Sequence, residues 1–577
     1  MSHRLTPRST FLPAALAFVG AVGCTTSNVA VGGRCPPDAR DTGFGCVFDP
    51  RVAVNSVGYL PDRVKRATVA AEVTSFQVRD ASGATVFEGS PTGPLTTRGA
   101  NGVDQDVWVL DFTEVTEPGE YFVTVEGPAP FPESPRFSIG ESVYDPLLHV
   151  LMLGMTGQRC GTEVAFSWEG SAFYHGACHL EDASLELVGG EAARRDGTGG
   201  WHDAGDYGKY TVNGAFASGM MLLGWEHFAD RLAGRAFDLP EAGDDVPDYL
   251  DENRYNLDWL LTMQNEDGSV AHKITPLDFP GMITPTDDID PRFFSDWGSA
   301  GTGDFVAVMA QAARVYEPVD EGFARDCLAA AEKAFLFLQE HPDLHQPDLS
   351  TFAQMQYNTR GDTDDRAWGS CELWETTGAD AALADCEARV AGIAPASNWD
   401  WSDLGSLAVY AYVLSRRADR DRRDPVLVAK KAAEIIKVAD AMAAAAETNP
   451  WGLAYTGGRY WGINGVYART VIGLRVAYLL EPKPEYLDAA TQQIDHLLGR
   501  NYYARSQVTG IGFGSPQQPH HRPSTADAAA QPWPGLLIGG AQPEVNSWKD
   551  DSTDATTGEN AINWNAPLIY AVAGFVR

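Results

Sequence analysis

The chain has 577 residues, of which 44% are hydrophobic and 21% are charged, and its formal net charge at pH 7 is −35. This length exceeds what one ordinary hydrophobic core supports, so we expect two or more domains. The negative charge argues against nucleic acid as a partner, because a phosphate backbone is bound by a basic surface. It also disfavours anionic membrane surfaces, whereas a neutral polysaccharide is not repelled. No internal apolar run of about 18 residues occurs, so we predict no membrane-spanning helix.

Residues 1–24 have the pattern of an export signal. Two arginines precede an apolar run over residues 11–22, and small residues then lead to Cys24. Residues 21–24 resemble a bacterial lipobox, in which Cys24 is the lipidated residue. We therefore expect an exported lipoprotein at the outer membrane or cell surface, held there only through its lipid, with ordinary secretion as the alternative. Residues 25–47 are rich in Gly, Ser, Thr and Pro and are expected to form a linker.

The remaining chain divides into a β region and a helical region. Residues 48–140 contain short segments rich in Val, Phe and Thr, separated by turn signals such as Glu117-Pro118-Gly119, which predicts a β-sandwich. Over residues 141–577 apolar side chains recur at helical spacing, and long loops rich in Gly, Asp and Pro lie between the segments. We expect many helices there and a site built from the loops.

The chain has eight cysteines. Because we expect it to be exported from the cytoplasm, disulfides can form between them. Cys35 and Cys46 close a short loop and are expected to pair. Cys371 and Cys386 form a second candidate pair. Cys327 lies in an Ala-rich helical pattern and is predicted to be a buried small hydrophobic residue.

The stretch 199–210 places two carboxylates, Asp203 and Asp206, three residues apart among glycines and large aromatic residues. Two neighbouring acids can hold one water, and the one that is ionised can deprotonate it. The aromatic residues, Tyr207 among them, offer flat apolar faces of the kind on which a sugar ring stacks. The alternative is a loop whose acids cap the helix that follows.

This stretch, the segment 506–522 and the segment 558–567 together resemble the signatures of family 9 glycoside hydrolases, the inverting cellulases. The resemblance covers roughly residues 50 to 577. It implies an (α/α)6 barrel for the helical domain. Residues 55–61 resemble the opening of the immunoglobulin-like domain that precedes some catalytic domains of the family, which implies that fold for the β-sandwich.

The resemblance also implies the catalytic roles. Asp206 matches the general base, Asp203 the second carboxylate that holds the water, and Glu559 the general acid. An inverting glycosidase needs such a pair, with the two carboxyl groups roughly 6.5–9.5 Å apart so that a water fits between base and sugar. For Glu559 the alternative is capping of the last helix.

Further matches imply residues that contact the substrate. His520 and Arg522 stand at positions of the family's substrate-binding signature, and both side chains can donate hydrogen bonds to sugar hydroxyls. Trp461 lies in a segment that resembles a sugar subsite, and Tyr207 is a further candidate. A metal site at the adjacent histidines is a weaker alternative, because no third ligand is obvious nearby.

Two thiols and two imidazoles form a candidate zinc site, because this ligand set suits tetrahedral zinc. Its members are Cys160, Cys178, His179 and His202. The segments that carry them resemble a structural zinc site of some bacterial family members. A disulfide between Cys160 and Cys178 remains the alternative.

Two groups of acidic residues are candidate calcium sites, because calcium prefers oxygen ligands. The first resembles the family's calcium loop and consists of Asp362, Asp364, Asp365 and Asp400. The second consists of Glu241, Asp244, Asp248 and Asp251. Solvated acidic loops are the alternative in a chain this acidic.

We therefore expect an exported, monomeric endo-β-1,4-glucanase that cleaves cellulose, cellodextrins or related β-glucans with inversion, with structural zinc and calcium. An exo-acting cellodextrinase or cellobiohydrolase and a glucosaminidase of the same family remain alternatives. A glycan-binding protein without catalysis is a third, against which the three matching carboxylates argue. A zinc hydrolase is a fourth, disfavoured because four protein ligands leave zinc no open position.

Overall fold

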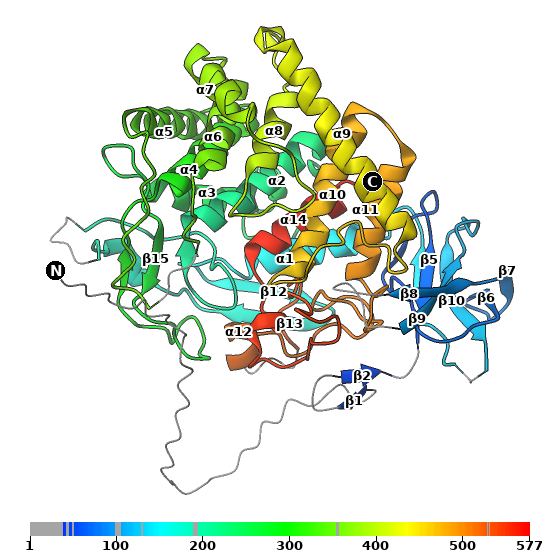
Figure 1. Ribbon diagram of the computed structural model, residues 1–577. Helices are drawn as coiled ribbons and strands as arrows, with labels where there is room; N and C mark the ends of the chain where they lie inside the picture. The colour runs from blue at the N-terminus through cyan, green and yellow to red at the C-terminus, as the bar shows by residue number, and fades with distance from the viewer. Residues whose placement is uncertain are drawn as a thin grey trace, which may run out of the picture. The chain divides into compact units, whose positions relative to one another are not determined.

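The computed structural model describes residues 51–97, 105–128, 131–188, 194–353, 357–527, 529 and 531–577 (Figure 1). It also gives the backbone of two short antiparallel strands, β1 (Ala39–Asp41) and β2 (Cys46–Phe48). The expected export signal with Cys24 and the expected Cys35–Cys46 pairing lie outside the described residues. No helix among the described residues is long and apolar enough to cross a membrane.

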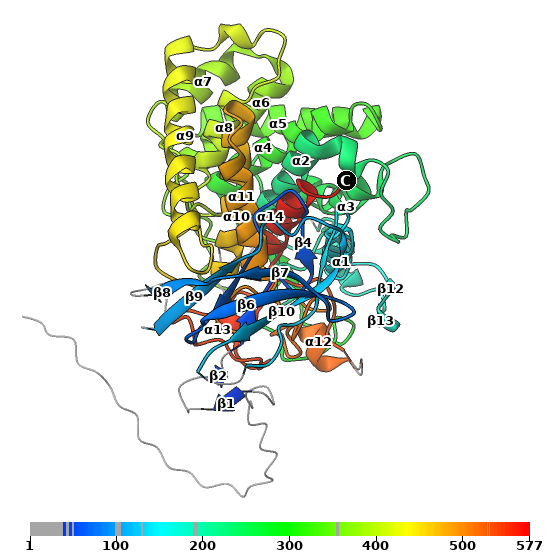
Figure 2. The same ribbon diagram turned by 90° about the vertical axis from the view of Figure 1, so that its right-hand side faces the viewer.

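Two sheets form the N-terminal β-sandwich (Figure 2). One has the order β3 (Val52–Ala53), β5 (Arg66–Val69), β9 (Gln105–Asp111), β8 (Thr92–Thr97). The other has the order β4 (Gly58–Tyr59), β11 (Phe137–Ile139), β10 (Gly119–Glu126), β6 (Ser75–Asp80), β7 (Thr85–Gly89). All neighbours are antiparallel except β4 and β11. Alternate residues such as Phe76 and Val78 on β6 point into the core between the sheets, as expected for half-buried strands.

Six helices of the second domain form an inner ring, in which each is buried nearly all round. They are α2 (Thr211–Leu232), α4 (Ser299–Tyr316), α6 (Thr363–Thr377), α8 (Gly405–Val413), α10 (Ile463–Leu480) and α14 (Ile562–Ala573). Contacts run from α10 to α14, α2, α4, α6 and α8 in turn.

Six further helices pack outside this ring. They are α1 (Asp145–Thr156), α3 (Asp248–Thr262), α5 (Glu321–Glu340), α7 (Asp380–Val390), α9 (Pro425–Thr448) and α11 (Pro484–Leu497). On α5 the buried residues, such as Phe323, Cys327 and Ala331, recur at helical spacing and face α4. The two rings confirm the predicted (α/α)6 barrel, and Cys327 is buried as expected.

Short elements lie in the loops of the barrel. They are β12 (Val164–Trp168), β13 (Ser171–His175), the 3-10 helices Leu180–Ser184 and Arg420–Arg422, β14 (Lys209–Tyr210), β15 (Lys273–Pro276), β16 (Arg292–Phe294), α12 (Arg522–Ala526) and α13 (Ala555–Gly558). The strands β14, β15 and β16 pair in a three-stranded sheet. The predicted disulfide between Cys371 on α6 and Cys386 on α7 is present, with the two Cα atoms 4.9 Å apart.

Candidate active site

The stretch 199–210 leads into α2 and is held by buried backbone hydrogen bonds. The His202 amide donates to the Gln158 carbonyl at 2.7 Å, and the Asp203 amide donates to the Gly208 carbonyl at 2.9 Å. At Gly205 an added Cβ would lie 2.2 Å from the His520 carbonyl oxygen, so this close approach requires glycine. The loop is therefore a rigid support for the two aspartates.

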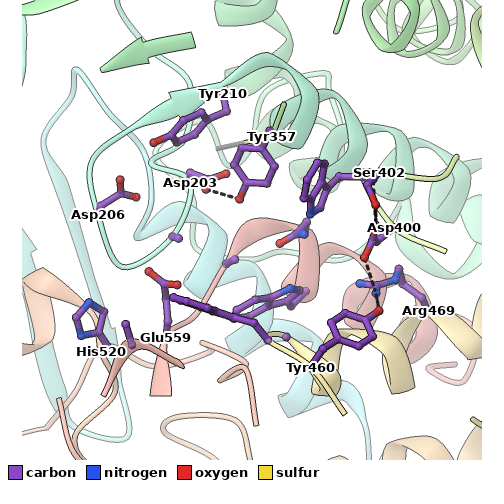
Figure 3. A pocket seen from close by; sticks show the side chains of 18 of the residues that line it. Asp203, Asp206, Tyr210, Tyr357, Asp400, Ser402, Tyr460, Arg469, His520 and Glu559 are labelled. Carbon is purple, nitrogen blue, oxygen red and sulfur yellow. Dashed lines mark hydrogen bonds and ion pairs between the residues drawn. The ribbon is translucent and has the colours of Figure 1, made fainter. Parts of the chain in front are cut away.

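Asp203, Asp206 and Glu559 line one cavity of about 1070 Å³ (Figure 3). A backbone hydrogen bond joins the segment that carries Glu559 to the loop of the two aspartates. The Ile562 amide donates to the Asp203 carbonyl at 2.9 Å. In Figure 3 the three carboxyl groups lie at one end of the view, and Asp400 and Arg469 lie at the other. The sequence predicted that the three acids belong to one site, and the structure brings them together in this cavity.

Asp203 is fixed by two side chains that the sequence reasoning missed. The Tyr357 hydroxyl donates to Oδ2 at 2.7 Å, and the Asn213 amide nitrogen donates to Oδ1. Burial and the neighbouring Asp206 raise the pKa of Asp203 to about 7, and these two hydrogen bonds oppose the rise. With both carboxylate oxygens hydrogen-bonded, the Asp203 side chain is held in one orientation.

The other two carboxyl groups differ in their surroundings. Burial raises the pKa of Asp206, and the positive charges of Arg522 and Arg292 oppose that rise. Burial, followed by the negative charges of Asp206 and Asp203, raises the pKa of Glu559 to about 8. At neutral pH Glu559 therefore carries a proton, which is the state required of a general acid.

Two of the predicted substrate-binding residues, Arg522 and Tyr207, donate hydrogen bonds to backbone carbonyls. Arg522 uses its guanidinium on backbone carbonyls: Nη1 donates to Gly205 at 2.7 Å and Nη2 to Pro280 at 2.9 Å. The Tyr207 hydroxyl donates to the Ile283 carbonyl at 2.6 Å, and its ring is buried away from the cavity. Both residues therefore position the loop that follows β15, and Arg522 also lines the cavity.

His520 and Trp461 line the cavity. The Ser552 carbonyl lies 2.7 Å from His520 Nδ1 and fixes the imidazole. Trp461 is 47% exposed, and its hydrogen bond to Glu559 lowers the pKa of that acid. A half-exposed indole beside the acid is suited to a sugar ring.

The two cysteines and two histidines of the candidate zinc site converge as predicted. One ligand atom from each residue lies within 4.8 Å of the others, and all four residues are buried. Cys160 Sγ lies 3.6 Å from His179 Nδ1, and Cys178 Sγ lies 3.8 Å from His202 Nε2. The thiols of Cys160 and Cys178 are free, so the alternative disulfide is not formed.

The first candidate calcium group is dispersed. Asp362 pairs with Arg366 at 2.7 Å, and Asp400 lies 3.8 Å from Arg469. Burial raises the pKa of Asp364, whose Oδ2 accepts a hydrogen bond from a backbone amide. Within the described ranges, the cysteine–histidine cluster is the only group of three or more His, Cys, Asp or Glu side chains whose ligand atoms converge on one point.

The acidic side chains of the second candidate calcium group lie close enough to repel one another, but their ligand atoms do not converge on one point. Burial and the negative charges of Asp244, Glu241 and Asp248 raise the pKa of Asp251 to about 7. Glu241 is neutralised by Arg159, which lies 2.8 Å away. The crowding is electrostatically unfavourable and would be relieved by a cation or a proton.

Comparisons with known proteins agree with this geometry. The model of "Glycosyl hydrolase family 9" matches residues 144–572, and that of "Cellulase N-terminal ig-like domain" matches residues 48–129. Endoglucanase D of Acetivibrio thermocellus is 41% identical over 534 residues, which cover 92% of this chain and 84% of that protein.

Two solved structures show the same architecture. A metagenome-derived family 9 endoglucanase is 34% identical, with a TM-score of 0.83 over 91% of this chain and 99% of the other. A Zn-binding triple mutant of the family 9 endoglucanase J30 is 30% identical, with a TM-score of 0.82 over 90% and 99% of the two chains. The chain belongs to glycosyl hydrolase family 9, and its N-terminal β-sandwich is the immunoglobulin-like domain of cellulases.

Proposed function

We propose that the chain is an endo-β-1,4-glucanase that hydrolyses cellulose, cellodextrins or related β-glucans with inversion. The observation that carries the proposal is the set of three carboxyl groups that line one cavity. The raised pKa of Glu559, about 8, favours the protonated form that a general acid requires at neutral pH. The 41% identity to an endoglucanase over 92% of the chain supports β-glucan as the substrate and an internal cut.

Each carboxyl group has one task in this reaction. Asp206 removes a proton from the attacking water, and Asp203, fixed by Tyr357 and Asn213, helps to hold that water. Glu559 donates its proton to the glycosidic oxygen as the bond to the departing glucan breaks. Water then adds to the face of the sugar opposite the leaving group, which inverts the anomeric carbon.

The anomer released first tests this mechanism. Proton NMR during the first minutes of cellopentaose hydrolysis, before mutarotation, should show α product. Asp206→Asn should lower kcat by about 10²–10⁴-fold, because general base catalysis typically contributes that much. Asp230→Asn, an exposed change on α2, serves as the matched control and should leave kcat unchanged. Initial β product, or an active Asp206→Asn variant, would refute the assignment.

We also propose that the cysteine–histidine cluster holds one structural zinc. Two buried thiols and two imidazoles within 4.8 Å supply four ligands of the type that zinc prefers and leave no position for substrate. Bound zinc would link Cys160 and Cys178 to His202, which precedes Asp203, and so brace the loop of the two aspartates.

Two further proposals concern calcium and location. Calcium is proposed at the acidic group around Asp251, where the crowded carboxylates support a cation. Calcium at the group around Asp364 is a weaker proposal, because two members of that group already face arginines. The proposed export, with Cys24 as the lipid anchor, rests on the N-terminal sequence alone.

A further inference from the structure

One buried carboxyl group contacts the cysteine–histidine cluster without belonging to it. Oδ2 of Asp288 lies 3.1 Å from Nε2 of His179, and both side chains are 1% exposed. The other ring nitrogen of His179, Nδ1, lies 3.6 Å from Cys160 Sγ, on the side of the cluster. The imidazole of His179 therefore lies between the cluster and Asp288.

The Asp288 carboxylate decides which nitrogen of His179 can bind a metal. An ionised carboxylate only accepts hydrogen bonds, so Nε2 must carry the hydrogen. In the neutral imidazole Nδ1 then keeps its lone pair, which a metal ligand requires. A carboxylate behind a ligating histidine fixes the ring orientation in this way and raises the basicity of the ligand.

The backbone of His179 also indicates that surrounding contacts hold this residue. Its φ is 50°, in the left-handed region that few residues with a Cβ adopt. Such a conformation costs energy and persists only where the surrounding structure fixes it. The contacts of the ring with Cys160 and Asp288 are of this kind.

The loop that carries Asp288 also borders the catalytic cavity. It covers residues 277–291 and joins β15 to β16. Phe279, near its start, lines the cavity, and Arg522 Nη2 donates to the Pro280 carbonyl at 2.9 Å. One end of the loop therefore lies at the cavity, and Asp288 brings the other end to the cluster.

Tyr207 forms a second link between the cluster and this loop. The centre of its ring lies 5.6 Å from that of His179 and 4.9 Å from that of His202. Its hydroxyl donates to the Ile283 carbonyl, in the loop, at 2.6 Å. The histidines of the cluster therefore reach the loop through both Tyr207 and Asp288.

We propose that Asp288 is a positioning residue of the cluster, which holds His179 in the form that binds zinc and ties the loop 277–291 to the metal. A metal bound at Nδ1 would fix the His179 ring. Through Asp288 that restraint would reach the loop that borders the catalytic cavity. The inference rests on the proposed structural zinc and does not depend on which glucan the enzyme cleaves.

Zinc affinity tests the positioning role in Asp288→Ala. Competition with a chromophoric chelator should show zinc binding that is about 10–100-fold weaker, the usual cost of losing such a partner. Asp290→Ala is the matched control, because Asp290 is an exposed carboxylate on the same loop, and it should bind zinc like the wild type. Asp288→Asn, whose amide oxygen can still accept from Nε2, should recover part of the loss. Each variant keeps the ion pair of 3.1 Å between Arg292, at the start of β16, and Asp182, which supports folding.

Hydrogen exchange tests the link to the cavity. In the wild type, removal of zinc by a chelator should speed exchange in residues 277–291 and 199–210. In Asp288→Ala, saturating zinc should still slow exchange in 199–210, through His202, but much less in 277–291.

Two results would overturn the inference: unchanged zinc affinity in Asp288→Ala, or wild-type exchange in 277–291 that does not respond to zinc. A purified wild type that binds no zinc would instead overturn the proposed metal site.

Discussion

Asp206 and Glu559 share one cavity, and burial raises the pKa of both, yet their charged neighbours act in opposite directions. Arg522 and Arg292 stabilise the ionised form of Asp206. Glu559 has fewer positive neighbours and faces the negative charges of Asp206 and Asp203, which stabilise its protonated form. These surroundings support the proposed roles of Asp206 as the base and Glu559 as the acid.

This division predicts a bell-shaped pH dependence of kcat/KM. Glu559 must be protonated, so activity should fall as the pH rises through its pKa of about 8. Asp206 must be ionised, and burial raises its pKa, so activity should fall on acidification at a pH above the usual aspartate range. The measurement is kcat/KM for cellopentaose between about pH 4 and about pH 10, a range that spans both limbs.

An aryl cellobioside assigns the alkaline limb. Its phenolate leaves with little protonation, so Glu559→Gln should retain measurable activity on it. That variant cannot lose the acid's proton and should therefore show no fall near pH 8. An alkaline limb that persists in Glu559→Gln would assign it to another group.

At the scale of elements, the loop of the two aspartates connects the acid–base chemistry to the proposed metal. His202 precedes Asp203 directly in the chain. The Cys160 amide donates to the Gly200 carbonyl at 2.8 Å, so the segment after α1 and the loop are joined by backbone as well as by the cluster. A metal at this cluster would stabilise the loop without touching substrate.

Zinc analysis tests this role. The purified chain should contain about one zinc, and Cys178→Ala should lose it and melt at a lower temperature. Cys327→Ala is the matched control, because Cys327 is also a buried free cysteine but lies on α5, outside the cluster. The control should keep its zinc. Full zinc content in Cys178→Ala, or a Cys160–Cys178 disulfide mapped by mass spectrometry, would contradict the site.

Local sequence predicted the parts of the site that lie in contiguous stretches. Asp203, Asp206 and Glu559 stand in distinctive strings, and the structure places them in one cavity. Tyr357 could not be found this way, because it reaches Asp203 from 154 residues away and only the fold brings the two together.

Local sequence does not predict the partners of hydrogen-bond donors and acidic side chains for the same reason. Sequence indicates which side chains can donate, but the fold decides which acceptor they meet. Arg522 and Tyr207 were both expected to contact substrate; Arg522 lines the cavity and also donates to the Pro280 carbonyl, whereas Tyr207 lies outside the cavity lining and donates to the Ile283 carbonyl. The acidic residue Asp362 likewise meets an arginine.

At the scale of the whole molecule, the β-sandwich and the barrel share polar contacts, one exposed and one buried, within residues 34–577. Arg66 on β5 makes two hydrogen bonds of 2.9 Å with Glu447 on α9. Asn55, in the segment that resembles the opening of the immunoglobulin-like domain, donates to Asp495 on α11 at 2.8 Å. Both Asn55 and Asp495 are buried, so this contact has no water to replace it.

Asn55 is therefore expected to couple the stability of the two domains. Its Oδ1 also accepts from the amides of Val57 and Gly58, at 3.0 and 3.1 Å, which shapes the chain at the interface. Asn55→Ala should cost about 1–3 kcal/mol, because a buried acceptor loses its donor. Gln77→Ala on β6, which removes an exposed hydrogen bond to Glu88, is the control and should change little.

The cost of Asn55→Ala should also depend on pH. Burial raises the pKa of Asp495 to about 7 in the folded protein, well above an unfolded aspartate, so its contribution to stability falls as the pH rises toward 7. The Asn55 hydrogen bond limits that rise in pKa. Without it Asp495 should ionise only at a higher pH, so the gap in melting temperature between wild type and variant should be larger at pH 8 than at pH 6. Calorimetry at the two pH values measures this gap, and an equal gap at both would show that Asn55 acts on packing and not on the charge of Asp495.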